Sequence, residues 1–272
     1  MSWTPPSLLI TVLDNQYLPV AQQLANKSGL PLKPTLSTQN PDASHYDKHW
    51  QLQLDANHLR IIRPDGLAIT VDFINSKAQR RSNEHNILQQ PLSKALGLKS
   101  FRKHNDHFPT VVDGTAGLGQ DAWLIARLGC NVTLIEQSPV LSTMLEFAVQ
   151  KALAHDDYQS TAKSLKVINA STPQYLSTST NPAADIVFLD PMYPARRKQA
   201  LVKKEMQMLH ELVGPDNNNQ QLLFSALNHA QYRVIVKRPK TAEPLAGTED
   251  WQGQLTSVSS PNTRFDIYHI AR

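Results

Sequence analysis

The chain has 272 residues, 40% of them hydrophobic and 18% charged, which allows one large core with or without a small satellite domain and disfavours global disorder. A single cysteine excludes an internal disulfide framework, and no apolar run approaches the roughly 18 residues that a membrane span needs. The N-terminus has neither the basic region nor the cleavage site of a signal peptide, so we expect a cytoplasmic protein with Cys130 buried as a small hydrophobe.

Residues 1–90 predict a small α+β subdomain. Residues 7–13 (SLLITVL) are typical of a strand, and residues 19–29 (PVAQQLANKSG) of a short helix that ends at its glycine. Residues 49–73 predict several strands, separated by Asp-Ala-Asn and Pro-Asp-Gly turns. Helical spacing then follows over residues 83–97, interrupted at a proline and ended by a glycine, before a basic loop.

Positive charge is concentrated in two places, although the whole chain carries only +4. Residues 77–103 hold seven Lys or Arg and one Glu, a local charge of +6, and a second cluster lies at 196–204. Clustered cations favour a polyanionic partner, because each neutralised phosphate releases counterions. The residues that we expect to contact RNA phosphates are Arg80, Arg81, Arg196, Arg197, Lys203 and Lys204.

Residues 91–272 predict a second, larger domain. Strands and helices alternate from about Thr110, as in a doubly wound α/β sheet. Further strands are expected in LKVINAS, DIVFLDP, YRVIVKRP and RFDIYHI, and helices in KKEMQMLHELVG and QQLLFSALNHA. Ligands of such sheets lie outside the carboxyl ends of the strands, and the polar motifs of this chain fall at those ends.

A glycine-rich turn follows the first of these strands, in VVDGTAGLGQDAW (residues 111–123). The strand ends at Asp113, and glycines such as Gly117 and Gly119 let a backbone approach a ligand closely. Dinucleotide-binding enzymes prefer the spacing G-x-G-x-x-G, which differs from the G-x-x-G-x-G found here. With a carboxylate just before the glycines, the turn favours a cationic amino-acid ligand over a diphosphate.

The next two strands add residues suited to a nucleoside. Glu136 ends the second strand about 20 residues after the glycines, where an acid can accept hydrogen bonds from both ribose hydroxyls. Ser171 and Thr172 follow the third strand, at the position that faces the adenine in nucleoside-binding sheets. Together with the glycine turn, these residues predict an adenosine-containing cofactor.

The stretch DIVFLDPMYP (residues 185–194) ends a predicted strand in the pattern D-P-x-Y. An exocyclic amine on a base is a poor nucleophile, because its lone pair is delocalised into the ring. The Asp190 carboxylate can accept its N–H bonds and orient the lone pair, while the Tyr193 ring stacks on the base. The prolines keep the turn stiff, which favours preorganisation. The pattern resembles the [N/D]-P-P-[Y/F] turn of amino-methyltransferases, and this resemblance implies methyl transfer to an amine.

Several blocks of the chain, DGTAGLGQDAW, IEQSP, LDPMYP, KQALVKKEMQMLHELVGPD, VIVKRP and RFDIY, resemble the bacterial ribosomal RNA small subunit methyltransferase J family. The resemblance implies a Rossmann-like class I methyltransferase that uses S-adenosylmethionine (SAM) to methylate guanine N2. It also implies cofactor contacts at Gln120, Asp121, Glu136, Gln137, Ser171, Thr172 and Asp190. Arg often occupies the positions of Gln120 and Gln137 in relatives.

These observations together predict a SAM-dependent enzyme that acts on a guanosine of small-subunit rRNA, free or in an assembling 30S subunit, without a metal. One alternative is an amino-methyltransferase for another acceptor, adenine N6 or a protein glutamine. A second is a non-catalytic RNA-binding factor with the same fold. The third, a nicotinamide dehydrogenase, is disfavoured by the glycine spacing.

Overall fold

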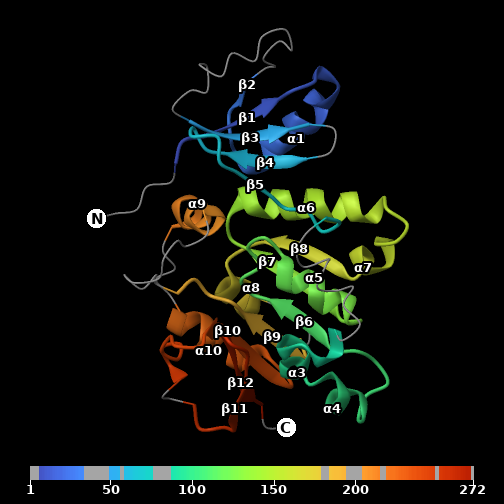
Figure 1. Ribbon diagram of the computed structural model, residues 1–272, viewed down its shortest axis with the longest axis vertical. Coiled ribbons are helices and arrows are strands. Elements are labelled where there is room, and N and C mark those ends of the chain that lie inside the picture. Colours follow the sequence, from blue (N-terminus) through green and yellow to red (C-terminus); the bar gives the residue numbers. More distant parts are fainter. Residues whose placement is uncertain are drawn as a thin grey trace. The chain divides into compact units, whose positions relative to one another are not determined.

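The computed structural model describes residues 6–33, 49–55, 58–75, 87–178, 184–193, 204–214, 219–248 and 251–270, with the side chains of 204–206 left out (Figure 1). The chain forms two units: Met1–Val71 with Pro194–Pro215, and Asp72–Tyr193 with Asp216–Arg272. The predicted division into domains after residue 90 stays a prediction, since these units are defined by packing alone.

The first unit is built on a five-stranded sheet in the order β2-β1-β3-β4-β5. The strands are β1 (Leu8–Val12), β2 (Leu32–Lys33), β3 (Trp50–Leu54), β4 (Leu59–Ile62) and β5 (Ala68–Thr70). β1 pairs in parallel with both neighbours, whereas β3, β4 and β5 are antiparallel. All five residues of β1 are buried, as expected for an apolar run in a central strand. The predicted strands of this region are confirmed.

Two helices complete the first unit. A short 3-10 turn, η1 (Asn15–Tyr17), leads into α1 (Leu18–Ser28), which ends at Gly29 in the left-handed region (φ 70°) as predicted. α9 (Lys204–Val213) comes from far along the chain and contacts β5. The Arg63 guanidinium donates hydrogen bonds to both oxygens of Glu211 on α9, at 3.2 and 3.3 Å. The chain therefore returns to this unit after Tyr193 and leaves it again after Pro215.

The second unit holds a seven-stranded sheet in the order β11-β12-β10-β9-β6-β7-β8. Its strands are β6 (Thr110–Asp113), β7 (Asn131–Glu136), β8 (Leu165–Asn169), β9 (Ile186–Leu189), β10 (Arg233–Pro239), β11 (Leu255–Ser259) and β12 (Thr263–His269). β12 is antiparallel to β10 and β11, and the other pairs are parallel. The winding direction reverses between β6 and β9, which is where such sheets bind ligands. The predicted α/β class, with its small N-terminal α+β part, is confirmed.

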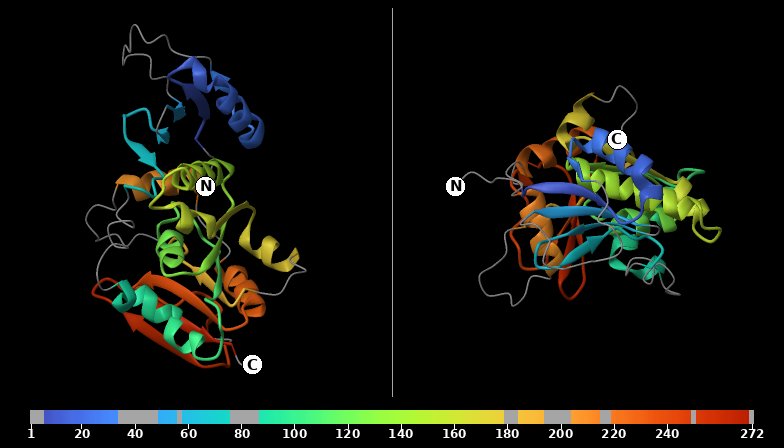
Figure 2. Two further views of the ribbon diagram at one scale, coloured as in Figure 1. Left: turned by 90° about the vertical axis from the view of Figure 1, so that its right-hand side faces the viewer. Right: turned by 90° about the horizontal axis from the view of Figure 1, so that it is seen from above.

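Helices cover this sheet on both faces (Figures 1 and 2). They are α3 (Pro91–Leu96), α4 (Leu98–Arg102), α5 (Gln120–Arg127), α6 (Pro139–Leu153), α7 (Gln159–Lys163), α8 (Thr172–Thr178) and α10 (Asn219–His229), with a 3-10 turn η3 (Ile87–Gln89). Because parallel crossovers are right-handed, the reversal places α5 and α6 on one face and α8 and α10 on the other. α3 contacts β11 and β12.

The core of the second unit accounts for several details of the sequence. Residues of β9 and β10 pack with α8 and α10 in one apolar cluster that includes Val187, Leu223 and Val236. Cys130 is fully buried, as predicted. Pro91 begins α3 at its first position, where a missing N–H costs nothing, and extended Gln90 separates α3 from η3, so the predicted interruption at this proline is confirmed. In the part of the chain that the structure describes, no helix has the length and apolarity to cross a bilayer.

Candidate functional site

The glycine turn joins β6 to α5 and is packed tightly at two of its glycines. A Cβ at Gly114 would lie 2.8 Å from Leu189 and Thr172 side-chain atoms, and one at Gly119 would lie 2.7 Å from Leu145. At Gly117, where φ is +53°, a Cβ would meet only a backbone oxygen at 3.8 Å. Gly117 is therefore the point of the turn where a ligand can approach the backbone, and positive φ keeps it glycine.

Asp113 ends β6 and is 2% exposed. One of its oxygens accepts a hydrogen bond from the Thr115 backbone N–H at 3.1 Å. Burial raises the pKa of Asp113 to about 8, and the fields of Asp121 and Asp190 act in the same direction, against the Thr115 bond and Lys237. A cation placed beside this carboxyl would favour its ionised form.

Glu136 ends β7 with its carboxylate held by two backbone amides. Gly117 N–H donates to Oε2 at 3.0 Å, and Ser138 N–H donates to Oε1 at 2.8 Å. The residue is 6% exposed, and this burial raises the pKa of Glu136 to about 7 despite both bonds. The glycine turn thus orients a carboxylate whose charge is poorly solvated. Hydrogen bonds from the hydroxyl groups of a ligand would stabilise that charge.

The residues after β8 support the neighbouring turns. The buried Thr172 hydroxyl donates to the Gly114 carbonyl at 2.5 Å, so it holds the glycine turn in place. The Asn169 side chain donates to the Glu136 carbonyl at 2.8 Å, a contact that sequence reasoning missed. Ser171 is half-buried just before α8. The predicted adenine contacts of Ser171 and Thr172 stay predictions.

The D-P-x-Y turn leaves β9 beside the glycine turn. The backbone N–H of Asp190 donates to the Thr115 hydroxyl at 2.6 Å, which joins the two predicted turns directly. Tyr193 is half-buried and packs against the apolar cluster of β10 and α10. Its hydroxyl is buried without a hydrogen-bond partner in the described part of the chain. Thr115 was not predicted, because a hydroxyl inside a glycine-rich turn gives no particular signal.

Lys237 is the residue of this site that sequence reasoning missed most clearly. It lies near the end of β10, and its Nζ donates to Asp121 Oδ2 at 2.5 Å and to Asp190 Oδ2 at 2.8 Å. Burial would lower the pKa of Lys237, but the two carboxylates outweigh burial and raise it. The available signal was a pair of cations, Lys237 and Arg238, that ends the apolar run of the strand sequence VIVKRP.

Not every predicted residue is brought into this cluster. Gln120 and Gln137 are exposed, at the start of α5 and just after β7. Arg80, Arg81, Arg196, Arg197 and Lys203 lie outside the described residues, and for Lys204 only the backbone, in α9, is described. The predicted RNA contacts therefore stay predictions.

The cluster suits a cationic adenosine ligand such as SAM. Asp121 and Asp190 with Lys237 leave a net charge of −1 even while Asp113 is protonated. The open approach above Gly117 and the buried acid at Glu136 add a backbone surface and a hydroxyl acceptor. Among the described residues, no group of three or more His, Cys, Asp or Glu is placed to hold a metal ion.

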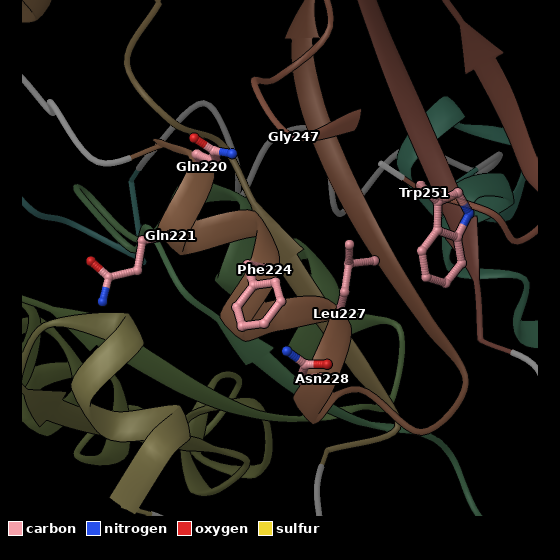
Figure 3. A pocket seen from close by; sticks show the side chains of 7 residues that line it. All are labelled: Gln220, Gln221, Phe224, Leu227, Asn228, Gly247 and Trp251. Carbon is pink, nitrogen blue, oxygen red and sulfur yellow. The ribbon is translucent and has the colours of Figure 1, made fainter. Parts of the chain in front are cut away.

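A separate hollow of about 480 Å³ lies along α10 and the loop after β10 (Figure 3). Two aromatic side chains, Phe224 and Trp251, contribute to its wall, and Phe224 is 67% exposed. Amide side chains and Leu227 complete much of the lining. None of the carboxylates described above lines it, so this hollow is distinct from the cluster at the strand ends.

Comparisons with known proteins identify the fold and the family of the chain. A family described as "Putative SAM-dependent methyltransferase" matches residues 36–270. The crystal structure of a SAM-dependent methyltransferase from Neisseria gonorrhoeae is similar over 96% of both chains, with 28% identity and a TM-score of 0.69. This likeness confirms the predicted methyltransferase fold.

Relatives that match over almost the whole length of both chains show the family. A ribosomal RNA small subunit methyltransferase J from Nitrosococcus oceani is 39% identical over 257 residues, which cover 93% of this chain and 94% of that protein. The protein of the same name from Coxiella burnetii is 36% identical over 96% of both chains. With Asp113, Glu136 and Asp190 gathered at one sheet edge, the chain belongs to the ribosomal RNA small subunit methyltransferase J family of SAM-dependent methyltransferases.

Proposed function

We propose that this protein transfers a methyl group from SAM to the exocyclic N2 amine of a guanosine in small-subunit rRNA. The observation that carries the proposal is the 2.6 Å hydrogen bond from the Asp190 backbone N–H to the Thr115 hydroxyl. It joins the D-P-x-Y turn to the glycine turn, so an amine held by Asp190 would lie beside a donor held by the glycines. The names of the relatives, ribosomal RNA small subunit methyltransferase J, support rRNA as the substrate.

Several residues of the chain would hold the donor. The Glu136 carboxylate would accept the ribose hydroxyls, Asp113 would lie near the cationic amino-acid end, and residues 117–121 would close around it. Ser171 and Thr172 would face the adenine through backbone groups, since the Thr172 hydroxyl already serves Gly114. Bound SAM would supply an electrophilic methyl group on a sulfonium, which an amine lone pair can displace in line.

Asp190 and Tyr193 would prepare the acceptor. Asp190 Oδ2 is engaged with Lys237, and in the described part of the chain Oδ1 accepts no hydrogen bond, so it is free for the amine. An N–H bond to Oδ1 would orient the nitrogen lone pair toward the methyl group. A base stacked on the Tyr193 ring would gain about 1–3 kcal/mol and would have its plane fixed. Positioning would then supply most of the rate.

The remaining parts of the proposal concern the RNA. Arg80, Arg81, Arg196, Arg197, Lys203 and Lys204 would grip phosphates near the target, while the pocket itself selects the base. The substrate would be the rRNA or the assembling 30S subunit, which places the reaction in the cytoplasm. We propose residues 91–272 as the methyltransferase domain and residues 1–90 as an accessory subdomain.

A methylation assay tests the proposal. The full chain is incubated with radiolabelled SAM and with rRNA or 30S subunits from a strain that lacks this protein, and labelled nucleosides are mapped by mass spectrometry. N2-methylguanosine at one position supports the proposal. Label on adenine N6 in DNA or on protein glutamine would replace the acceptor, and RNA binding without transfer would indicate a non-catalytic factor. Binding of NAD instead of SAM would indicate a dehydrogenase.

A further inference from the structure

Lys237 connects the two halves of the site. Its Nζ lies 2.8 Å from Asp190 Oδ2, on the acceptor side, and 2.5 Å from Asp121 Oδ2, in the first turn of the helix that follows the glycine turn. Asp190 extends β9 and Lys237 lies on the neighbouring β10, where Val236 pairs with Leu189. The contact is therefore set by the register of two parallel strands.

We propose that Lys237 is the positioning residue for the methyl acceptor, which fixes the Asp190 carboxylate as an ionised acceptor and ties it to the donor-binding turn through Asp121. This role rests on the proposed function, because it assumes that Asp190 holds the substrate amine. Lys237 itself need not touch the substrate. Its bond occupies Oδ2, while Oδ1 accepts no hydrogen bond from the residues that the structure describes and would receive the N–H donor.

The surrounding charges explain why a cation is needed at this point. Asp190 faces Lys237 on β10, Asp121 on α5, Asp113 at the end of β6 and the Tyr193 hydroxyl in its own turn. The surrounding protein raises the pKa of Asp190 by desolvation, Lys237 opposes that shift, and the Asp121 carboxylate adds to it. Without the ammonium, two carboxylates would share the site and Asp190 would hold a proton to higher pH. A protonated Asp190 is a poorer acceptor for the amine.

A merely structural lysine would behave differently. If Lys237 only pinned α5 to the end of β10, its loss would lower stability but leave the ionisation of Asp190 and the pH dependence of the reaction unchanged. The pH profile therefore separates the two roles. The charge also matters for the donor, because removing one positive charge makes the site more attractive to a cation. Affinity for SAM is thus expected to hold while methyl transfer fails.

The test compares Lys237→Met, Lys237→Arg and the matched control Lys166→Met, an exposed strand lysine outside the site. Single-turnover methylation of rRNA is measured from pH 6 to pH 9.5 at saturating SAM. We expect Lys237→Met to be slowed about 10²-fold at pH 7. The acid limb of the pH–rate profile of this variant should move up by one pH unit or more, so that part of its methylation rate returns at high pH. Lys237→Arg should recover most of the rate, and Lys166→Met should match the parent.

Two readouts do not depend on turnover. Calorimetry should give Lys237→Met an affinity for SAM within about threefold of the parent's, since the donor contacts are unchanged. A ¹³C carboxyl titration of the ligand-free protein, with the Asp190 resonance assigned from Asp190→Asn, should place its midpoint higher in Lys237→Met than in the parent. If Lys237→Met does not fold, Asp121→Asn serves instead, because removing that carboxylate should move the midpoint down.

The outcomes are distinguishable. A parent protein that forms no N2-methylguanosine overturns the proposed function itself. A parent that forms it, together with a Lys237→Met variant of normal rate and unshifted acid limb, overturns the role of Lys237 alone. Loss of SAM affinity in proportion to the loss of rate would also overturn it, because Lys237 would then serve only the donor.

Discussion

Lys237 and Arg238 are neighbours on β10, yet their side chains enter two different ionic clusters on opposite sides of the strand. Arg238 donates to Asp266 at 2.5 Å and to the Ala242 carbonyl, and Arg264 donates to the other Asp266 oxygen at 2.6 Å. Asp266 is 3% exposed and both of its oxygens are satisfied. Asp190, in the Lys237 cluster, is 37% exposed, and among the described residues only one of its carboxylate oxygens accepts a hydrogen bond.

This difference separates a structural cluster from a functional one. The Asp266 carboxylate is paired with two guanidinium groups, so its charge is compensated without a ligand and its partners hold β10 and β12 together. A carboxylate that is held in position but has an oxygen without a hydrogen bond can accept one from a ligand. Burying such a charged group lowers stability, so its presence indicates a functional role. Asp113 and Glu136 accept hydrogen bonds from backbone amides but form no ion pair among the described residues, and burial raises the pKa of both.

The largest effect is expected on stability, from Arg238→Met. Removing one partner leaves Asp266 as a buried charge supported only by Arg264, and such losses cost about 3–5 kcal/mol of unfolding free energy. Urea unfolding of the full chain measures it, with Arg264→Met as control, whose half-exposed side chain should cost much less. SAM affinity per folded molecule should stay normal. A stable Arg238→Met with weakened SAM binding would reverse the assignment of the two clusters.

Asp190→Ala is expected to remove a contact that matters only in the reaction. Loss of a single preorganised hydrogen-bonding group of this kind typically slows a reaction about 10²–10³-fold. Single-turnover assays measure the loss, and the melting temperature should change little because Asp190 is partly exposed. Asp190→Asn keeps the shape of the turn and should also be slow, since an amide cannot accept on both sides as a carboxylate does. Near-parental turnover in both variants would remove the proposed role.

Glu136→Ala should affect the donor and not the RNA. Each charged hydrogen bond lost costs about 1.5–3 kcal/mol, which is roughly a 10- to 150-fold weaker affinity for SAM. Calorimetry measures this change, with the exposed Asp156→Ala as a control. Binding of rRNA without cofactor should be the same in all three proteins. An affinity for SAM equal to the parent's would place the ribose elsewhere.

The pH dependence of donor binding follows from the same carboxyl. Burial raises the pKa of Glu136 to about 7, and hydroxyl donors prefer its ionised form, so affinity should fall about tenfold from pH 8 to pH 6. In the ligand-free protein the raised pKa means that stability declines as pH rises from about 4.5 to about 7. The ligand's own amino group titrates nearby, so the difference between parent and Glu136→Gln is the quantity to measure. The same slope in both proteins would contradict the assignment.

Much of the fold could be predicted because its signals are local. Hydrophobic runs and the residues that end them predicted the alternation of strands and helices. They also predicted the end of α1 at Gly29 and the end of β6 at Asp113. β11, with four of its five residues exposed, lacks an apolar pattern and was missed. The return of α9 to the first unit was also missed, because it depends on long-range contacts such as Arg63 with Glu211.

The site residues that could be predicted are those whose position at the end of a strand indicates a role in ligand binding. Asp113, Glu136 and Asp190 each end a strand, and strand ends are where this class of sheet binds ligands. Lys237 could not be assigned, since its role comes from partners 116 and 47 residues away in the chain. The hydrogen bond from the Thr172 hydroxyl to the Gly114 carbonyl could not be predicted either, because it joins residues that are 58 positions apart in the chain.

The smallest effect is expected from the basic residues that the sequence predicts to contact RNA. Lys237 and Arg238 are neutralised within the protein and should contribute nothing to phosphate contacts, whereas Arg196 and Arg197 are proposed to grip them. Each single-strand phosphate contact changes the slope of log K against log salt by about 0.7. Arg196→Ala with Arg197→Ala should therefore lower the slope of rRNA binding by about 1.4 if both contact phosphates, and should weaken binding while leaving SAM affinity unchanged. Lys237→Met should keep the parental slope. Filter binding or fluorescence anisotropy across a salt series measures both, and an unchanged slope in the double variant would mean that RNA enters by another face.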